Sequence, residues 1–289
     1  MNKKNLDWTV IPRGGWGDMF VSYANMCQLD NRFNVLLNGQ DKYIAKFLEY
    51  QDNIEEVIFV PYENKKTLEE MAIETDNINE TNNKKWIKEL TNISLDKFVL
   101  THPNFEQKKN RQIIRKFPYK LPENNWKIKP HSLLFNPYSI QSLTASNHCP
   151  LMPEILNWLV HGTDWNIVLI GQETYNHVML GETKFPLQIS GDTTGLQNLV
   201  GKTESMMDVF NIADQCDGII TTSNCLSLWS IISNNPAVVV LNDVLTHPTE
   251  RIALNFFKEW INHHPNTLLD CDCTPDQFME TFKKWEKTL

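Results

Sequence analysis

An aspartate follows a glycine-rich turn near the start of the chain. Gly15 and Gly17 come after an apolar run and before a helical pattern, where glycines let the backbone turn sharply and a ligand approach closely. Asp18 closes this turn, and its carboxylate could act as a general base that projects into a cleft. It also has an ordinary structural explanation, because the helix dipole stabilises an acidic residue in the first helical turn. The spacing leaves both roles open.

A polar run in the second half of the chain lies between a buried strand and a helix. The run Thr221-Thr222-Ser223-Asn224 follows the apolar residues 218–220 and precedes a second apolar segment. A strand-to-helix turn presents unpaired backbone N–H groups and the positive end of the helix dipole, which together hold an anion. We therefore expect a phosphate group at this turn, which indicates a nucleotide-linked substrate.

Several other site patterns are incomplete or absent. Phe20 takes the place of the third glycine in the dinucleotide fingerprint, and no acidic residue ends the second expected strand. A nicotinamide cofactor is therefore disfavoured. The sequence has no Gly-x-Ser-x-Gly elbow, Walker A loop or His-Glu-x-x-His motif, which removes several classes of hydrolase and nucleotide triphosphatase.

Possible metal ligands gather near the C-terminus. The tripeptide Asp270-Cys271-Asp272 has a spacing that can hold a divalent ion, but we interpret it as a solvated surface loop far from both strand-to-helix turns. The nearby histidines and cysteines match no common zinc spacing. We expect neither a bound metal nor a cofactor.

The elements that must position these residues alternate between strand and helix. In the first half, strands are expected over 8–12, 33–37, 56–61 and 98–101, with helices from 19 and over 42–50. In the second half, strands are expected over 132–136, 166–171, 218–222 and 237–241, with helices over 150–161, 206–213, 250–262 and 275–287. This order predicts an α/β protein with two doubly wound, Rossmann-like domains that face each other across a cleft. The proline-containing segment 117–130 is interpreted as the linker, with domains over 1–125 and 126–289.

Composition narrows the class of protein. The net charge of −8 argues against a non-specific nucleic-acid binder. No run approaches the roughly 18 to 20 apolar residues that span a bilayer. The N-terminus has no apolar core of a signal peptide, and the six cysteines are scattered, so we expect a reduced, cytoplasmic chain. The sequence leaves the oligomeric state open.

One stretch nevertheless carries concentrated positive charge. It contains six basic residues and no acidic one, namely Lys108, Lys109, Arg111, Arg115, Lys116 and Lys120. A solvated helix near a domain junction would explain it, and so would a groove for a phosphate-bearing substrate.

Several segments resemble the heptosyltransferase-like glycosyltransferases, family nine of the sequence classification, which have the GT-B fold. Residues 11–29 are similar to the family's opening strand, Gly-Asp pair and helix, without its proline. In the second half, the likeness is carried by Leu134-Phe135-Asn136-Pro137, by Ile167 to Gly171, by Leu199-Val200-Gly201-Lys202-Thr203, by Gly218 to Asn224 and by Asn235 to Val239. It is weakest between residues 63 and 130.

The resemblance implies an inverting, metal-independent transfer of sugar from a nucleotide-sugar donor to a hydroxyl acceptor. The donor would lie against the C-terminal domain, with Lys202, Thr203, Thr222, Ser223 and Asn224 as its binding residues. Asp18 would be the catalytic base. Arg13, Gly15 and Gly17 would contact the acceptor or the phosphates, and the last helix would cross back onto the N-terminal domain.

The chain departs from the family pattern at the donor turn. Where relatives have Asp-Ser-Gly-x-x-His, this sequence keeps Ser223 but has Thr222, Asn224 and Ser227 in place of the acid, the glycine and the histidine. The basic residue that usually follows the first strand of the second domain is also missing. The donor's sugar and base therefore stay undefined.

The acceptor is likewise open among three alternatives. A bacterial surface glycan, on a lipid-linked or other carrier, is the family's usual acceptor. A phage-type enzyme that glycosylates hydroxymethylated pyrimidines in DNA is the second alternative, motivated by the basic stretch. A GT-B-like domain that binds nucleotide or sugar without turnover is the third, because family residues are lost.

Overall fold

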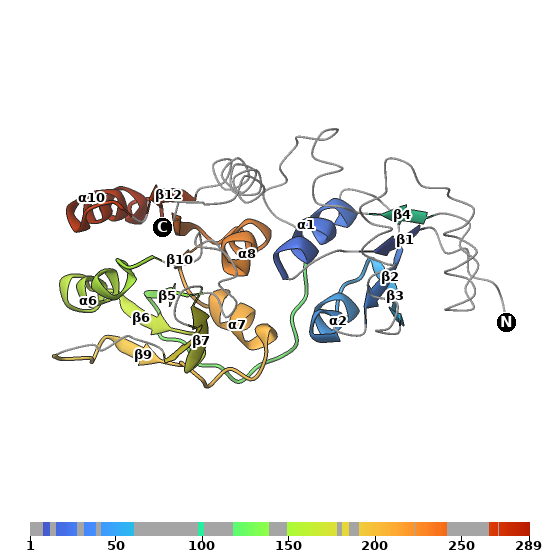
Figure 1. Cartoon of the computed structure of the whole chain (residues 1–289), viewed down its shortest axis with the longest axis horizontal. Coiled ribbons are helices and arrows are strands. Elements are labelled where there is room, and N and C mark those ends of the chain that lie inside the picture. The colour runs from blue at the N-terminus through green and yellow to red at the C-terminus, as the bar shows by residue number, and fades with distance from the viewer. Residues whose placement is uncertain are drawn as a thin grey trace. The chain divides into compact units, whose positions relative to one another are not determined.

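The computed structural model describes residues 8–11, 16–27, 32–38, 42–60, 98–100, 118–138, 149–177, 181–184, 191–222, 224–241, 266–270 and 272–289. The chain divides into two compact units, Met1–Pro122 and Glu123–Leu289 (Figure 1). The sequence interpretation had divided the chain between residues 125 and 126. Each unit contains one parallel sheet, which we describe in turn.

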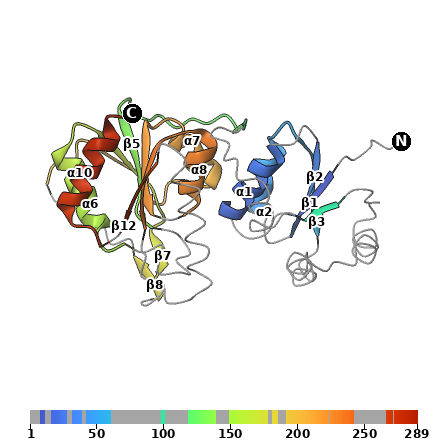
Figure 2. The same ribbon diagram turned by 90° about the horizontal axis from the view of Figure 1, so that it is seen from above.

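Unit 1 holds a sheet in the order β3-β2-β1-β4, with parallel pairing throughout. Its elements are β1 (Trp8–Ile11), α1 (Trp16–Cys27), β2 (Phe33–Asn38), α2 (Lys42–Glu49), β3 (Ile54–Val60) and β4 (Phe98–Leu100). Both helices lie against one face of the sheet (Figure 2). Their buried residues recur at helical spacing, so each helix turns one apolar stripe inward. The predicted βαβαβ order is confirmed.

The start of α1 differs from its expected position. The helix begins at Trp16 rather than Met19, so Gly17 and Asp18 lie in its first turn and not in the preceding loop. An aromatic contact accounts for the earlier start. Trp16 lies one turn before the buried Phe20, and their ring centroids are 5.7 Å apart. This contact extends the apolar stripe of the helix by one turn.

The first part of the expected linker is fixed to unit 1. Gln51 is 3% exposed, and its side-chain amide pairs with both backbone groups of Lys120: Oε1 accepts from Lys120 N at 2.9 Å and Nε2 donates to Lys120 O at 3.0 Å. The Tyr23 hydroxyl donates to the carbonyl of Pro118. Burial raises the pKa of Tyr23 well above its ordinary value, so this hydroxyl keeps its proton at physiological pH.

The later part of the segment is held by unit 2. The indole Nε1 of Trp126 donates to Asp208 at 3.1 Å, and the side chain of Gln197 donates to the carbonyl of Lys127 at 3.2 Å. Residues 118–120 and 126–127 therefore each belong to a folded unit. The boundary between the two units, after Pro122, falls within the segment 117–130 that was interpreted as the linker, and the residues on either side of it are hydrogen-bonded to their own unit.

Unit 2 is built on a six-stranded parallel sheet in the order β12-β11-β10-β5-β6-β9. Its strands are β5 (Ser132–Asn136), β6 (Asn166–Leu169), β9 (Leu196–Asn198), β10 (Gly218–Thr222), β11 (Ala237–Leu241) and β12 (Thr267–Asp270), beside an antiparallel pair of β7 (Thr174–His177) and β8 (Gly181–Lys184). Its helices are α6 (Met152–Gly162), α7 (Met206–Ala213), α8 (Cys225–Ser233) and α10 (Pro275–Glu286).

Helices cover both faces of this sheet. α6 and α10 lie on one face, and α7 and α8 on the other (Figure 2). The central strands β5, β10 and β11 are consequently buried at every position, as their continuous apolar runs predicted. The predicted bounds of these three strands agree with the structure. The four short strands β7, β8, β9 and β12 were not predicted, because three or four residues carry too little periodicity.

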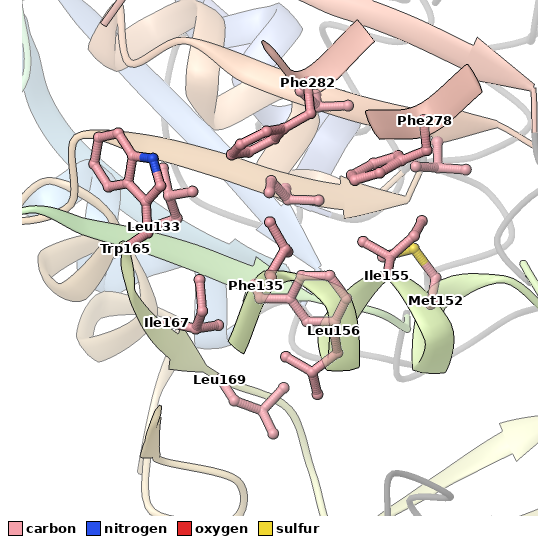
Figure 3. Close-up of a cluster of buried hydrophobic side chains, with 14 of the residues drawn as sticks. Leu133, Phe135, Met152, Ile155, Leu156, Trp165, Ile167, Leu169, Phe278 and Phe282 are labelled. Atoms are coloured by element: carbon pink, nitrogen blue, oxygen red, sulfur yellow. The ribbon is translucent and has the colours of Figure 1, made fainter. Parts of the chain in front are cut away.

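The last helix packs inside unit 2. Phe278, Phe282 and Trp285 of α10 are at most 2% exposed and join side chains of β5, α6 and β6 in one core cluster. Figure 3 shows Phe278 and Phe282 packed against this cluster. A capping box between Thr274 and Gln277 starts this helix. The expectation that the last helix crosses onto the N-terminal domain is wrong, because its apolar face is buried in unit 2. The helix expected over 250–262 lies outside the described residues.

Candidate functional site

The strand order of unit 2 places a topological switch point between β5 and β10. From β5 the chain proceeds to β6 and β9 on one side, and then to β10, β11 and β12 on the other. Since all pairings are parallel, the carboxyl ends of β5 and β10 lie side by side. Open α/β sheets bind ligands in the crevice outside the carboxyl ends at such a point. Asn136 ends β5, and Thr222 ends β10.

A polar network joins these two strand ends. The Asn224 side chain donates from Nδ2 to Asn136 Oδ1 at 2.7 Å and to Thr221 Oγ1 at 2.8 Å, and its Oδ1 accepts from the backbone N–H of Leu226 at 2.9 Å. Asn136 Nδ2 in turn donates to the carbonyl of Ile170 at 3.4 Å. Asn224 therefore serves as the N-cap of α8 and as a tie between β5 and β10. Its side chain fixes the turn, and a ligand at this turn would meet the backbone.

The start of α8 favours an anion. The first turn of the helix contains no acidic residue, so nothing in it offsets the positive end of the dipole. Cys225 is its first residue, and burial raises the pKa of the thiol to about 12. The thiol is therefore neutral near pH 7 and brings no negative charge to the turn. This arrangement suits a phosphate group.

The substitutions within the family motif have structural explanations. Ser227 stands in place of the family's histidine, but it is 1% exposed and its hydroxyl donates to the carbonyl of Asn224 at 2.7 Å. Thr222 stands in place of the acid and is fully buried. Neither side chain can take over the role of the lost group toward a ligand. Ser223, the retained residue, lies outside the described part of the chain.

A second turn, after β9, holds Lys202 and Thr203. Gly201 has a φ of +68°, in the left-handed region, and an added Cβ would come within 2.8 Å of Glu173 Cγ, so this turn favours glycine. Lys202 is exposed and its Nζ donates to the carbonyl of Asn198 at 2.8 Å. Three strand spacings separate β9 from β10, which places the two turns about 14 Å apart. The structure thus brings Thr222 and Asn224 together but not Lys202 and Thr203 beside them.

In unit 1, the predicted base lies at the carboxyl edge of the sheet. Asp18 is the third residue of α1, which follows β1, and Gly17 is the second. Arg13 and Gly15 lie outside the described residues. So do the basic residues 108–116, whereas the Nζ of Lys120 pairs with Asp52.

The interpretation of Asp270-Cys271-Asp272 as a solvated surface segment agrees with the exposure of Asp270 and Asp272, but the placement of Asp270 in a loop far from the strand-to-helix turns is wrong. Asp270 ends β12, which pairs in parallel with β11, so it lies at the same sheet edge as Thr222, two strands away. The pattern was missed because β12 is four residues long. Among the described residues, no group of three or more His, Cys, Asp or Glu side chains could hold a metal ion.

Asn136 is the functional candidate that the sequence interpretation did not select. It belongs to a segment that resembles the family, but its hydrogen bond with Asn224 joins residues 88 positions apart. A polar residue at the end of an otherwise apolar strand, followed by proline, was the available signal.

The fold and site together define a class of structure: two units, each with a parallel sheet flanked by helices, and a switch-point turn suited to an anion. Three similar solved structures are glycosyltransferases with the GT-B fold. The chain is similar to the family 9 glycosyl transferase from Veillonella parvula (TM-score 0.60, 14% identity, 99% of this chain and 91% of that one). The predicted α/β, GT-B fold class is confirmed.

Two E. coli enzymes share the fold over nearly their full lengths. The chain is similar to ADP-heptose lps heptosyltransferase II, with a TM-score of 0.54 and 13% identity over 97% of this chain and 98% of that one. It is also similar to the heptosyltransferase WaaC, solved with ADP, with a TM-score of 0.51 and 10% identity over 98% of this chain and 99% of that one. No protein-family model matches the sequence, and the comparison with curated proteins gives no match. Within the described residues, no helix is long and apolar enough to cross a bilayer.

Proposed function

We propose that the protein is a glycosyltransferase that moves a sugar from a nucleotide-sugar donor to a hydroxyl group of a bacterial surface glycan. The observation that carries this proposal is the capped, acid-free start of α8 at the switch point of the unit 2 sheet. The names of the similar structures support the donor class, because one contains ADP and another is described as an ADP-heptose enzyme.

The proposed reaction is a single displacement with inversion. Asp18 accepts the proton of the acceptor hydroxyl as its oxygen attacks the anomeric carbon, and the bond from that carbon to the diphosphate oxygen breaks. The leaving diphosphate gains negative charge, which the backbone N–H groups at the start of α8 stabilise. Arg13 is the cation proposed to assist.

Asn224→Ala is expected to weaken nucleoside diphosphate binding at least about tenfold, which corresponds to about 1.4 kcal/mol. The variant loses the N-cap of α8 and leaves Asn136 and Thr221 without their shared donor. Isothermal titration calorimetry with ADP, UDP and GDP measures the effect and also identifies the nucleobase of the donor.

A matched control lies at the other end of the same helix. Asn234→Gly changes the C-cap, where a φ of 60° suits glycine, and should leave binding unchanged. Asn224→Asp keeps a capping oxygen but adds a negative charge. Its main effect should therefore be weaker nucleoside diphosphate binding, with only a small decrease in Tm. Equal binding by wild type and Asn224→Ala would contradict the donor site, and binding without donor hydrolysis or transfer would favour a non-catalytic binder.

Chelation is expected to leave transfer intact. In the proposed mechanism the leaving diphosphate is stabilised by amides and cationic side chains, so no divalent ion takes part. Initial rates with and without EDTA test this. Loss of activity in EDTA that Mg²⁺ or Mn²⁺ restores would instead implicate Asp270 and Asp272.

A further inference from the structure

Two aromatic side chains stand together at the carboxyl edge of the unit 1 sheet. Trp16 is the first residue of α1 and Tyr43 is the second of α2, and their ring centroids are 5.8 Å apart. The two helices follow β1 and β2, which are neighbouring parallel strands. Both rings therefore lie at the edge where sheets of this kind bind ligands.

Two buried aromatic rings pack against this pair. Phe20 and Phe47 are at most 1% exposed, and their ring centroids lie 5.7 and 6.4 Å from that of Trp16. Phe20 and Phe47 also meet edge to face at 5.6 Å. Tyr43 is 49% exposed and Trp16 is partly exposed. The pair thus combines packing against buried rings with partial exposure to solvent, which is the form of a preorganised binding surface.

Exposure alone does not single out these residues, because Tyr50 at the other end of α2 is 46% exposed. Tyr50 follows the helix and precedes β3, so it lies at the amino edge of the sheet, away from the expected ligand side. Trp16, in contrast, shares its helical turn with Asp18. Helix geometry places their Cα atoms about 5 Å apart.

We propose that Trp16 and Tyr43 form an aromatic platform that holds the pyranose ring of the acceptor next to Asp18. This inference rests on the proposed glycosyl transfer and assigns its acceptor subsite. The C–H bonds on one face of a pyranose are weakly positive and pack against the negative faces of aromatic rings. The hydroxyl groups at the ring's rim remain free to point toward the base. The net charge of −8 favours such a neutral ring over DNA.

Saturation-transfer-difference NMR on the full chain tests the platform. The probes are the methyl pyranosides of glucose, galactose, mannose and heptose at millimolar concentration, with hydroxymethylated deoxycytidine as the nucleobase probe. The variants are Tyr43→Ala, Trp16→Ala and the matched control Tyr50→Ala. Circular dichroism and nucleoside diphosphate binding are measured on each variant, so that a folding defect is recognised.

We expect saturation of the C–H protons of at least one pyranoside in wild type and in Tyr50→Ala. Tyr43→Ala should weaken that binding about fivefold, since one aromatic contact is lost. Three results would overturn the platform: no pyranoside signal in wild type, an equal signal in Tyr43→Ala, or saturation of the nucleoside alone. If wild type binds a pyranoside but no nucleoside diphosphate, the donor site is refuted and the aromatic platform is not. The experiment therefore distinguishes failure of the proposed function from failure of the platform.

Discussion

Asp18→Asn is expected to lower turnover at least about 100-fold while nucleoside diphosphate affinity stays within a few-fold of wild type. A general base contributes to the chemical step alone, at about 100-fold or more, so its loss lowers kcat and leaves donor binding largely unchanged. The position of Asp18 in the first turn of α1, at the carboxyl edge of the unit 1 sheet, is the structural basis of this assignment. Initial-rate kinetics of transfer and donor hydrolysis measure the effect.

Asp52→Asn is the matched control for Asp18→Asn. Asp52 is exposed in the same unit and pairs with Lys120, but it lies between α2 and β3, at the amino edge of the sheet. Its replacement should leave turnover unchanged. If Asp18→Asn retains more than about a tenth of wild-type turnover, Asp18 is not the base, because that role is worth more. Its carboxylate would then only stabilise the helix through the dipole, and Asp18→Asn would lower Tm and leave turnover largely unchanged.

Trp285→Ala is expected to destabilise unit 2 by about 3 to 5 kcal/mol. Trp285 is 2% exposed and packs so closely on the first residue of β10 that a Cβ added at Gly218 would lie 2.6 Å from its ring. No hydrogen bond to its indole nitrogen is found among the described residues, so the loss comes from packing. Hydrogen-exchange protection of the β5 and β10 amides reports the stability of unit 2 by itself.

Two further variants accompany Trp285→Ala, one that tests the same contact and one that serves as a control. Gly218→Ala tests the same contact from the strand side, and overpacking against the ring should cost about 1 to 3 kcal/mol. Lys284→Ala lies next to Trp285 on α10 but carries an exposed side chain paired with Glu280, so protection should not change. Full protection in Trp285→Ala would mean that α10 contributes little to the core.

Local sequence pattern determined most of the elements near the site. The continuous apolar runs of β5, β10 and β11 defined these strands because both faces of a parallel sheet are buried, a property that each run displays alone. The polar residues at the end of β10, with the helical pattern that follows, located the turn that we propose to bind a phosphate. The loss of the family's acid and histidine was also visible in the sequence.

Tertiary packing decided the features that the pattern left open. The start of α1 at Trp16 depends on the aromatic contact with Phe20 and on Tyr43, which lies in another helix. Strand β12 exists because its four residues pair with β11, and this pairing brings Asp270 to the ligand edge. The docking of α10 inside unit 2 depends on a core shared by β5, α6 and β6.

The candidate site shows the same division. Sequence placed Thr222 and Asn224 at a strand-to-helix turn, because turn and cap preferences act within a few residues. It did not place Asn136 beside them, since that hydrogen bond joins residues 88 positions apart. The sequence also did not show that Lys202 lies away from this turn, because their distance is set by the three strand spacings between β9 and β10. Local preferences are encoded in short segments, whereas strand order and side-chain partners form only when distant segments pack together.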